Sequence, residues 1–300
     1  MYSEKRNSQS QFVALRRQRY HVRTWGEAKP GQAPLFMVHG WMDVAASFQF
    51  VIDAFQTERY VIAPDWRGYG LSDWGHSDNY WYPDYLADLD FLIDHFSADQ
   101  PIDLLGHSMG GHVVTLYAGI RPERIRRLIN LEGFGVPATQ PGQASKRYAQ
   151  WMDQLKAFQR GELALRSYDS LAGVASRLMK TNRRLSQDKA DWLARHWSRQ
   201  NANGQWEILG DPAHRIVNAQ LTRLDETLEI YQRITAPCLM VEAEDNQMDF
   251  WYRGRYCLAE FHERLKHVPR VTQAKVRDAG HMLHHDQPQP LARLIENFLA

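Results

Sequence analysis

The sequence predicts an α/β fold in which helices cover both faces of a mostly parallel sheet. Three observations support this prediction. Short runs of consecutive apolar residues recur along the 300-residue chain, as is typical of strands buried on both faces. Segments with apolar residues at helical spacing lie between these runs. Buried strands that alternate with amphipathic helices form parallel sheets that are covered on both sides.

The candidate strands begin after a polar segment, residues 1–10, which we expect to be a flexible lead-in. Residues 12–15 are β-like, and residues 20–25 alternate as a half-exposed strand does. Residues 26–34 form a turn-rich break. Buried strands are then predicted at residues 35–38, 60–63, 102–105, 128–131, 238–241 and, with a weaker pattern, 271–276.

Helical spacing of apolar residues is clearest in residues 86–96 and 291–298. Between about residue 136 and residue 225 no buried strand is predicted, and several amphipathic helical segments follow one another instead. We interpret residues 136–225 as a helical cap. It would be inserted between two parts of one α/β core, residues 1–135 and 226–300.

The composition is that of an ordinary globular protein, with 44% hydrophobic and 24% charged residues. The 36 basic and 35 acidic residues leave a net charge of +1, so we expect no nucleic-acid partner. Two cysteines are too few for a disulfide framework or a cysteine-based metal cluster. The N-terminus lacks the apolar run of a signal peptide. No stretch is as long as the run of about 18 apolar residues that a membrane helix needs. A cytoplasmic protein without a membrane anchor is therefore expected.

One motif carries chemistry directly. Gly106, Ser108 and Gly110 form the pattern G-x-S-x-G after a buried strand and before the helix-like run 113–118. The turn is so tight that side chains at the two glycines would clash with backbone. It would lift Ser108 to the end of the sheet beside a helix N-terminus, where negative charge is favoured. A glycine-rich turn with an idle serine is the alternative, and the flanking strand and helix disfavour it.

Two further segments supply partners for Ser108. Trp41 follows the buried run 35–38, and its N–H, together with that of Met109, would form an oxyanion hole. His281 lies near the C-terminus and is the candidate general base. A nucleophile, then an acid, then a histidine is the chain order of this architecture.

These segments resemble the α/β-hydrolase superfamily. The resemblance covers nearly the whole chain and rests on four motifs, at residues 39–40, 64–72, 106–111 and 280–281. Residues 132–135 and 178–212 are most similar to the serine hydrolase-like proteins. The resemblance implies an α/β-hydrolase fold: an eight-stranded, mostly parallel sheet with a cap inserted after the sixth strand.

Two carboxylates compete for the place of the triad acid. The position that is commoner in the superfamily follows the seventh strand, but Asn246 occupies it here and Asp245 lies one residue early. Glu132 follows the sixth strand, where some haloalkane dehalogenases, which this arrangement resembles, carry their acid. A one-residue shift in a tight loop re-aims a side chain, so we favour Glu132 and keep Asp245 as the alternative.

Other polar residues are expected to be structural. The spacing of four polar residues near the C-terminus does not match the helical H-E-x-x-H pattern: His281, His284, His285 and Asp286. We therefore expect no metal site there. The neighbours of His281 in this group are expected to be solvated. His107 and His112 are expected to pack within the structure. Asp65 and Arg67 are expected to form a structural pair within a loop. Asp43 is expected to be a helix cap or a loop anchor. The cap tryptophans divide between cap core and pocket lining: Trp151, Trp192, Trp197 and Trp206.

The predicted function is a carboxylesterase-like serine hydrolase. Ser108 would attack a small to medium, largely apolar ester, His281 would take its proton, and Glu132 would stabilise the imidazolium; no cofactor or metal is needed. Activity should rise with pH as His281 loses its proton. The apparent pKa of this rise should be close to the value of free imidazole, about 6.5, and the neighbouring carboxylate would adjust it. The alternatives are a cofactor-free dioxygenase of a quinolone-like heteroaromatic, which shares the fold and serine elbow, and a non-catalytic ligand-binding protein.

Overall fold

The computed structural model describes residues 2–75 and 77–300 and contains one eight-stranded sheet with the order β1-β2-β4-β3-β5-β6-β9-β10. The β1–β2 and β2–β4 pairs are antiparallel, and every other pair in this sheet is parallel. The predicted mostly parallel, eight-stranded sheet is thus confirmed. The strands are β1 (Ser8–Leu15), β2 (Gln18–Trp25), β3 (Leu35–Val38), β4 (Val61–Pro64), β5 (Ile102–His107), β6 (Ile125–Leu131), β9 (Cys238–Ala243) and β10 (Val271–Val276).

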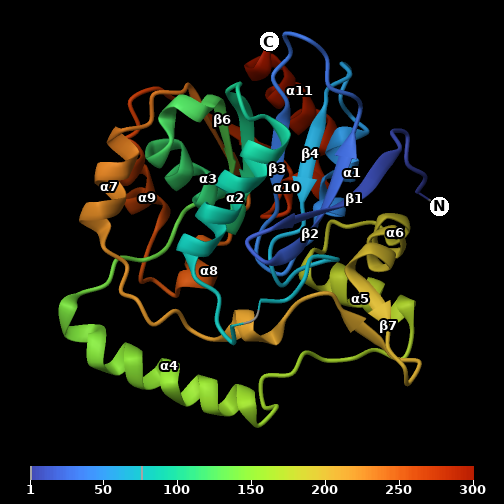
Figure 1. Cartoon of the computed structure of the whole chain (residues 1–300), viewed down its shortest axis with the longest axis vertical. Helices are drawn as coiled ribbons and strands as arrows, with labels where there is room; N and C mark the ends of the chain where they lie inside the picture. The colour runs from blue at the N-terminus through green and yellow to red at the C-terminus, as the bar shows by residue number, and fades with distance from the viewer. Residues whose placement is uncertain (1, 76) are drawn as a thin grey trace.

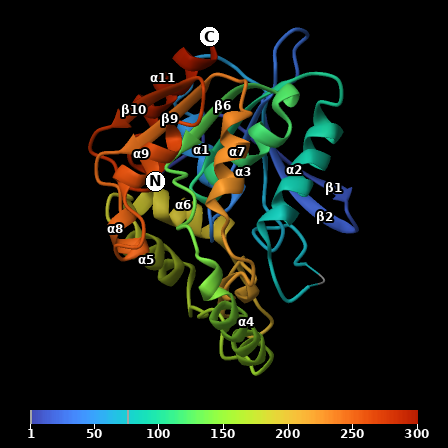
Figure 2. The ribbon, with the colours of Figure 1, turned by 90° about the vertical axis from the view of Figure 1, so that its left-hand side faces the viewer.

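Helices cover both faces of the sheet, as Figures 1 and 2 show. Alternate residues of the central strands point to opposite faces, so that Phe36 of β3 joins one core cluster and Met37 joins the other. The first cluster is covered by α2 (Tyr82–Phe96), α3 (Met109–Ile120), α7 (Leu224–Gln232) and α9 (Leu258–Leu265). The second is covered by the short helices η1 (Ala45–Phe48) and α1 (Gln49–Ile52), and by α10 (Leu283–Asp286) and α11 (Pro288–Leu299). The short helix α8 (Met248–Tyr252) follows β9.

The chain between β6 and α7 forms a separate group of elements. It contains η3 (Pro141–Gln143), α4 (Ala144–Gln159), α5 (Leu171–Thr181), α6 (Gln187–Trp197), the two-stranded pair β7 (Ser198–Gln200) and β8 (Trp206–Ile208), and η4 (Pro212–Arg215). In Figure 1, α4 extends along one end of the molecule, away from the sheet. A third core cluster joins α5 and α6 to Phe50 of α1. The assignment of residues 136–225 as a cap domain stays a prediction.

The expected flexible lead-in is wrong. Strand β1 begins at Ser8, and Tyr2 is anchored by its hydroxyl, which donates a hydrogen bond to Asp53. The Tyr2 ring also packs edge-on against Phe50 and Trp192, with ring centroids 4.8 Å and 5.5 Å away. One aromatic side chain thus holds a segment whose sequence has no apolar run.

No helix in residues 2–75 or 77–300 has both the length and the apolar character needed to cross a membrane.

Candidate active site

Ser108 lies in the turn between β5 and α3, with backbone angles of φ 53° and ψ −116°. A positive φ is uncommon for a residue with a side chain and indicates a strained turn. A Cβ on Gly106 would lie 2.3 Å from the carbonyl oxygen of Gly110, and one on Gly110 would lie 2.4 Å from that of Val38. The prediction that this turn excludes side chains at both glycines is confirmed.

Ser108, His281 and Glu132 meet although three different loops carry them. The Ser108 hydroxyl lies 2.8 Å from Nε2 of His281, and Nδ1 of the same ring lies 3.4 Å from Oε2 of Glu132. The second distance is at the long end for a hydrogen bond. The other Glu132 oxygen accepts a hydrogen bond of 2.6 Å from the N–H of Ala243, at the end of β9. The side chains are therefore ordered as a nucleophile, a base and an acid would be.

The alternative acid is engaged elsewhere. Asp245 is 58% exposed at its side chain, and its carboxylate forms an ion pair with Arg184, which precedes α6. Asn246, at the commoner acid position, lies 3.4 Å through its side-chain oxygen from the N–H of Met248, at the start of α8. Of the two candidate carboxylates, Glu132 is the one within reach of His281 in the described structure.

Burial sets the protonation of this pair. Burial, with the neighbouring His107 ring, lowers the pKa of His281 well below its ordinary value, so the imidazole is neutral near pH 7. Burial raises the pKa of Glu132 to about 8, with a smaller contribution from Glu242, whereas the Ala243 N–H opposes the rise. Since the two groups share one hydrogen bond, they titrate as a pair. The proton that is taken up as pH falls therefore belongs to the pair rather than to either side chain alone.

The two expected oxyanion donors flank Ser108. Met109 is the first residue of α3, so its N–H has no acceptor within the helix and points from the positive end of the helix dipole. A Cβ on Gly40 would come within 3.0 Å of the Ser108 Cβ, so the backbone leading into Trp41 runs directly beside the serine. The role of Trp41 and Met109 as oxyanion donors stays a prediction.

A cavity of about 450 Å³ opens onto these three side chains. Its lining is mostly apolar and comes mainly from the chain between β6 and α7, from α8, and from the loops that carry Trp41, Ser108 and His281. Trp197 lines it, whereas Trp192 packs into the third core cluster. Trp251 of α8 also lines it and packs edge-on against the His281 ring, with centroids 4.0 Å apart. No sequence pattern pointed to Trp251, because this residue lies outside the predicted cap.

Two expectations about neighbouring residues need correction. His284 and His285 are buried rather than solvated, because α10 packs against η1 and Nε2 of His285 lies 2.6 Å from the Ser47 hydroxyl. Asp65 and Arg67 are structural, but they do not pair with each other: His21 lies 2.7 Å from the Asp65 carboxylate. Arg67 instead forms an ion pair with the buried Asp88 of α2. Asp43 accepts a hydrogen bond of 3.0 Å from the Trp197 indole, as a loop anchor would.

Comparisons with known proteins agree with this architecture. A family model described as alpha/beta hydrolase fold matches residues 33–288. The chain is 22% identical to a serine hydrolase-like protein of Danio rerio over 92% of this chain and 86% of that protein. It is 23% identical to human serine hydrolase-like protein 2, over 93% and 90% of the two chains. A thioesterase domain from the curacin biosynthetic pathway superposes with a TM-score of 0.80 at 23% identity, covering 97% and 99%. The chain belongs to the α/β-hydrolase family.

Proposed function

We propose that this protein is a serine hydrolase that cleaves a small to medium, largely apolar carboxylic ester through an acyl-enzyme. The observation that carries the proposal is the 2.8 Å contact between the Ser108 hydroxyl and Nε2 of His281 at the wall of a mostly apolar cavity. A neutral imidazole in contact with a serine hydroxyl is the arrangement that activates serine as a nucleophile.

The reaction follows from the order of the side chains. Ser108 Oγ attacks the ester carbonyl while its proton passes to Nε2 of His281, and the carbonyl electrons move onto the oxygen. The N–H groups of Trp41 and Met109 are assigned to this oxyanion. The tetrahedral intermediate collapses, the alkoxide leaves with the proton from His281, and an acyl-serine remains. Water then attacks the acyl-serine while His281 takes its proton. This proton passes to Ser108 Oγ as the bond between the acyl carbon and Oγ breaks and the carboxylic acid leaves.

The pH dependence of kcat/KM tests the Glu132–His281 pair. The active form has a neutral imidazole and an ionised carboxylate, so activity is lost as pH falls and the pair takes up one proton. Burial raises the pKa of the Glu132 carboxyl to about 8, so the pair is expected to take up this proton above pH 6.5, the ordinary histidine value. In Glu132→Gln only His281 titrates, and the limb should move below pH 6.5. Initial rates between about pH 5 and about pH 9 at constant ionic strength measure the shift. If the rising limb lay at the same pH in the wild type and in Glu132→Gln, Glu132 would not be coupled to the general base His281.

Chain length of the acyl group tests the substrate class. Each methylene that enters the apolar cavity contributes roughly 0.8 kcal/mol, about fourfold in kcat/KM. The gain should stop when the chain exceeds the cavity of about 450 Å³. A series of p-nitrophenyl esters of increasing length should therefore pass through a maximum at moderate length. A clear preference for emulsified long-chain lipid over soluble esters would contradict the proposal.

Halide release from 1-chlorobutane is the matched negative test. A serine alkoxide that displaced chloride would form an ether, which has no carbonyl for water to attack, so the cycle would stop after one turnover. Sustained halide release would be incompatible with a Ser108 nucleophile. Labelling of Ser108 by a fluorophosphonate, with full turnover in the absence of oxygen, separates the hydrolase from a cofactor-free dioxygenase and from a binding protein.

A further inference from the structure

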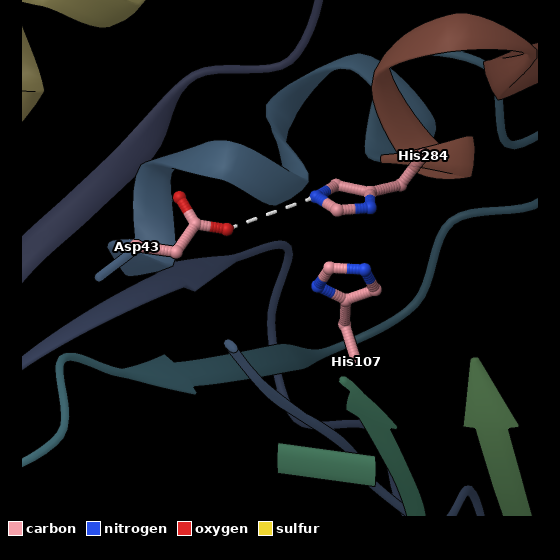
Figure 3. Close-up of side chains that lie close together, drawn as sticks. All are labelled: Asp43, His107 and His284. Carbon is pink, nitrogen blue, oxygen red and sulfur yellow. Dashed lines mark ion pairs between the residues drawn. The ribbon is translucent and has the colours of Figure 1, made fainter. Parts of the chain in front are cut away.

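A group of buried polar side chains lies beside the candidate active site and takes no part in the proposed reaction. Asp43 follows β3, His107 ends β5, and His284 belongs to α10. Their exposed fractions are 4%, 1% and 0%. One ligand-type atom from each lies within 4.8 Å of the other two, and Oδ2 of Asp43 lies 3.9 Å from Nε2 of His284. Figure 3 shows the carboxylate and both rings facing one another.

The hydrogen bonds around these side chains define which atoms offer lone pairs. Nε2 of His107 lies 2.7 Å from the main-chain oxygen of His281. A carbonyl oxygen only accepts, so this nitrogen carries the proton and Nδ1 of His107 presents a lone pair. Oδ1 of Asp43 accepts from Trp197, which leaves Oδ2 free to bind something else. Within the described chain, Nδ1 of His107, Oδ2 of Asp43 and both ring nitrogens of His284 have no hydrogen-bond partner.

Unpartnered polar atoms in a protein interior are costly and need an explanation. We propose that Oδ2 of Asp43, Nδ1 of His107 and Nε2 of His284 bind one divalent transition-metal ion, with zinc as the best-matched ion. Two imidazoles and one carboxylate are a ligand set that Zn²⁺ takes in three-ligand sites. Ligand atoms around such an ion are about 3.4 Å apart. Small side-chain rotations would close the present separation of up to 4.8 Å.

The surroundings of two ligands are those of a built metal site. Metal-binding histidines generally donate their other N–H to a carbonyl or carboxylate, as His107 does to the main chain of His281. The Asp43 carboxylate is likewise oriented by the Trp197 indole. Asp43 and His107 also line the cavity that holds Ser108, which gives an ion a path of entry. This ligand set differs from the group at residues 281–286 that the sequence excluded, and shares only His284 with it.

The test is Zn²⁺ binding by the full chain, measured in competition with a chromophoric chelator. The wild type is expected to bind one equivalent that Asp43→Asn and His284→Gln lose. Asparagine retains the oxygen that accepts from Trp197, so Asp43→Asn changes the charge with little change in shape. His262→Gln is the matched control, because His262 forms a partly exposed pair of 2.6 Å with Glu242 and represents adventitious binding by the chain's 13 histidines. This control is expected to keep the tight equivalent.

Two further readouts keep the test decisive if a variant folds poorly. Co²⁺ bound to the wild type should give the intense visible bands of a tetrahedral site, and Zn²⁺ should raise the Tm of the wild type and of His262→Gln but not of Asp43→Asn. Equal Zn²⁺ binding by the wild type and Asp43→Asn would overturn the proposal. The absence of tight Zn²⁺ binding by the wild type would also overturn it, and would indicate that a hydrogen-bonded water occupies the site instead. The proposed ester hydrolysis has no step that involves the metal ion, so a chelator should leave turnover unchanged. The metal-binding proposal and the hydrolase proposal can therefore fail independently of each other.

Discussion

Ser108→Ala is expected to lower turnover by about 10³-fold or more, which corresponds to roughly 4 kcal/mol of lost transition-state stabilisation. The substitution removes the Oγ that contacts Nε2 of His281 and that would form the acyl-enzyme. Any remaining rate would come from the oxyanion donors and from binding in the cavity. Initial rates with the best p-nitrophenyl ester measure the loss.

The same variant is expected to keep its thermal midpoint nearly unchanged. Alanine fits the backbone at φ 53° about as well as serine does, and the lost hydroxyl lies at the wall of a cavity rather than in the core. A mass shift after fluorophosphonate treatment should appear in the wild type and be absent from Ser108→Ala. Persistent activity in a folded Ser108→Ala protein would remove Ser108 from the mechanism.

Glu132→Gln is expected to lower turnover by about 10²-fold to 10⁴-fold. The carboxylate accepts the Nδ1 proton of His281, which leaves the Nε2 lone pair facing the Ser108 hydroxyl. A glutamine amide that donates to Nδ1 instead selects the opposite tautomer, in which Nε2 carries the proton and cannot accept another. Since glutamine retains the shape of the side chain, the substitution should lower kcat while the variant still folds.

Asp245→Asn is the matched control for Glu132→Gln. Asp245 forms an exposed ion pair with Arg184, and exposed pairs contribute only about 0–1 kcal/mol. Turnover should therefore stay within about fivefold of the wild type. A loss from Asp245→Asn as large as that from Glu132→Gln would reverse the assignment of the acid.

The sequence predicted the sheet well because a strand buried on both faces leaves a continuous apolar run. All four residues of β3 and all six residues of β5 and of β9 are buried. It also predicted the meeting of Ser108 with His281 and Glu132, because each follows a strand and the carboxyl ends of parallel strands lie at one edge of the sheet.

The cluster of Asp43, His107 and His284 was beyond sequence reasoning. These residues come from three distant parts of the chain, so no spacing along the sequence indicates that they meet. Trp251 was missed for a related reason: its place beside His281 depends on how α8 packs after β9, and no local pattern encodes that packing.

Two further glycines connect the serine turn to the acid. A Cβ on Gly111, in the first turn of α3, would lie 2.8 Å from Cα of Gly133, and one on Gly133 would lie 2.6 Å from Cα of Gly111. The segments that carry Ser108 and Glu132 thus touch backbone to backbone, so a methyl group added at either glycine would displace nucleophile and acid together. Residues 136–223 lie outside this contact, although they supply much of the cavity wall. In protein engineering, chimeras that exchange this segment with that of a relative should change which esters fit while the reacting groups keep their spacing.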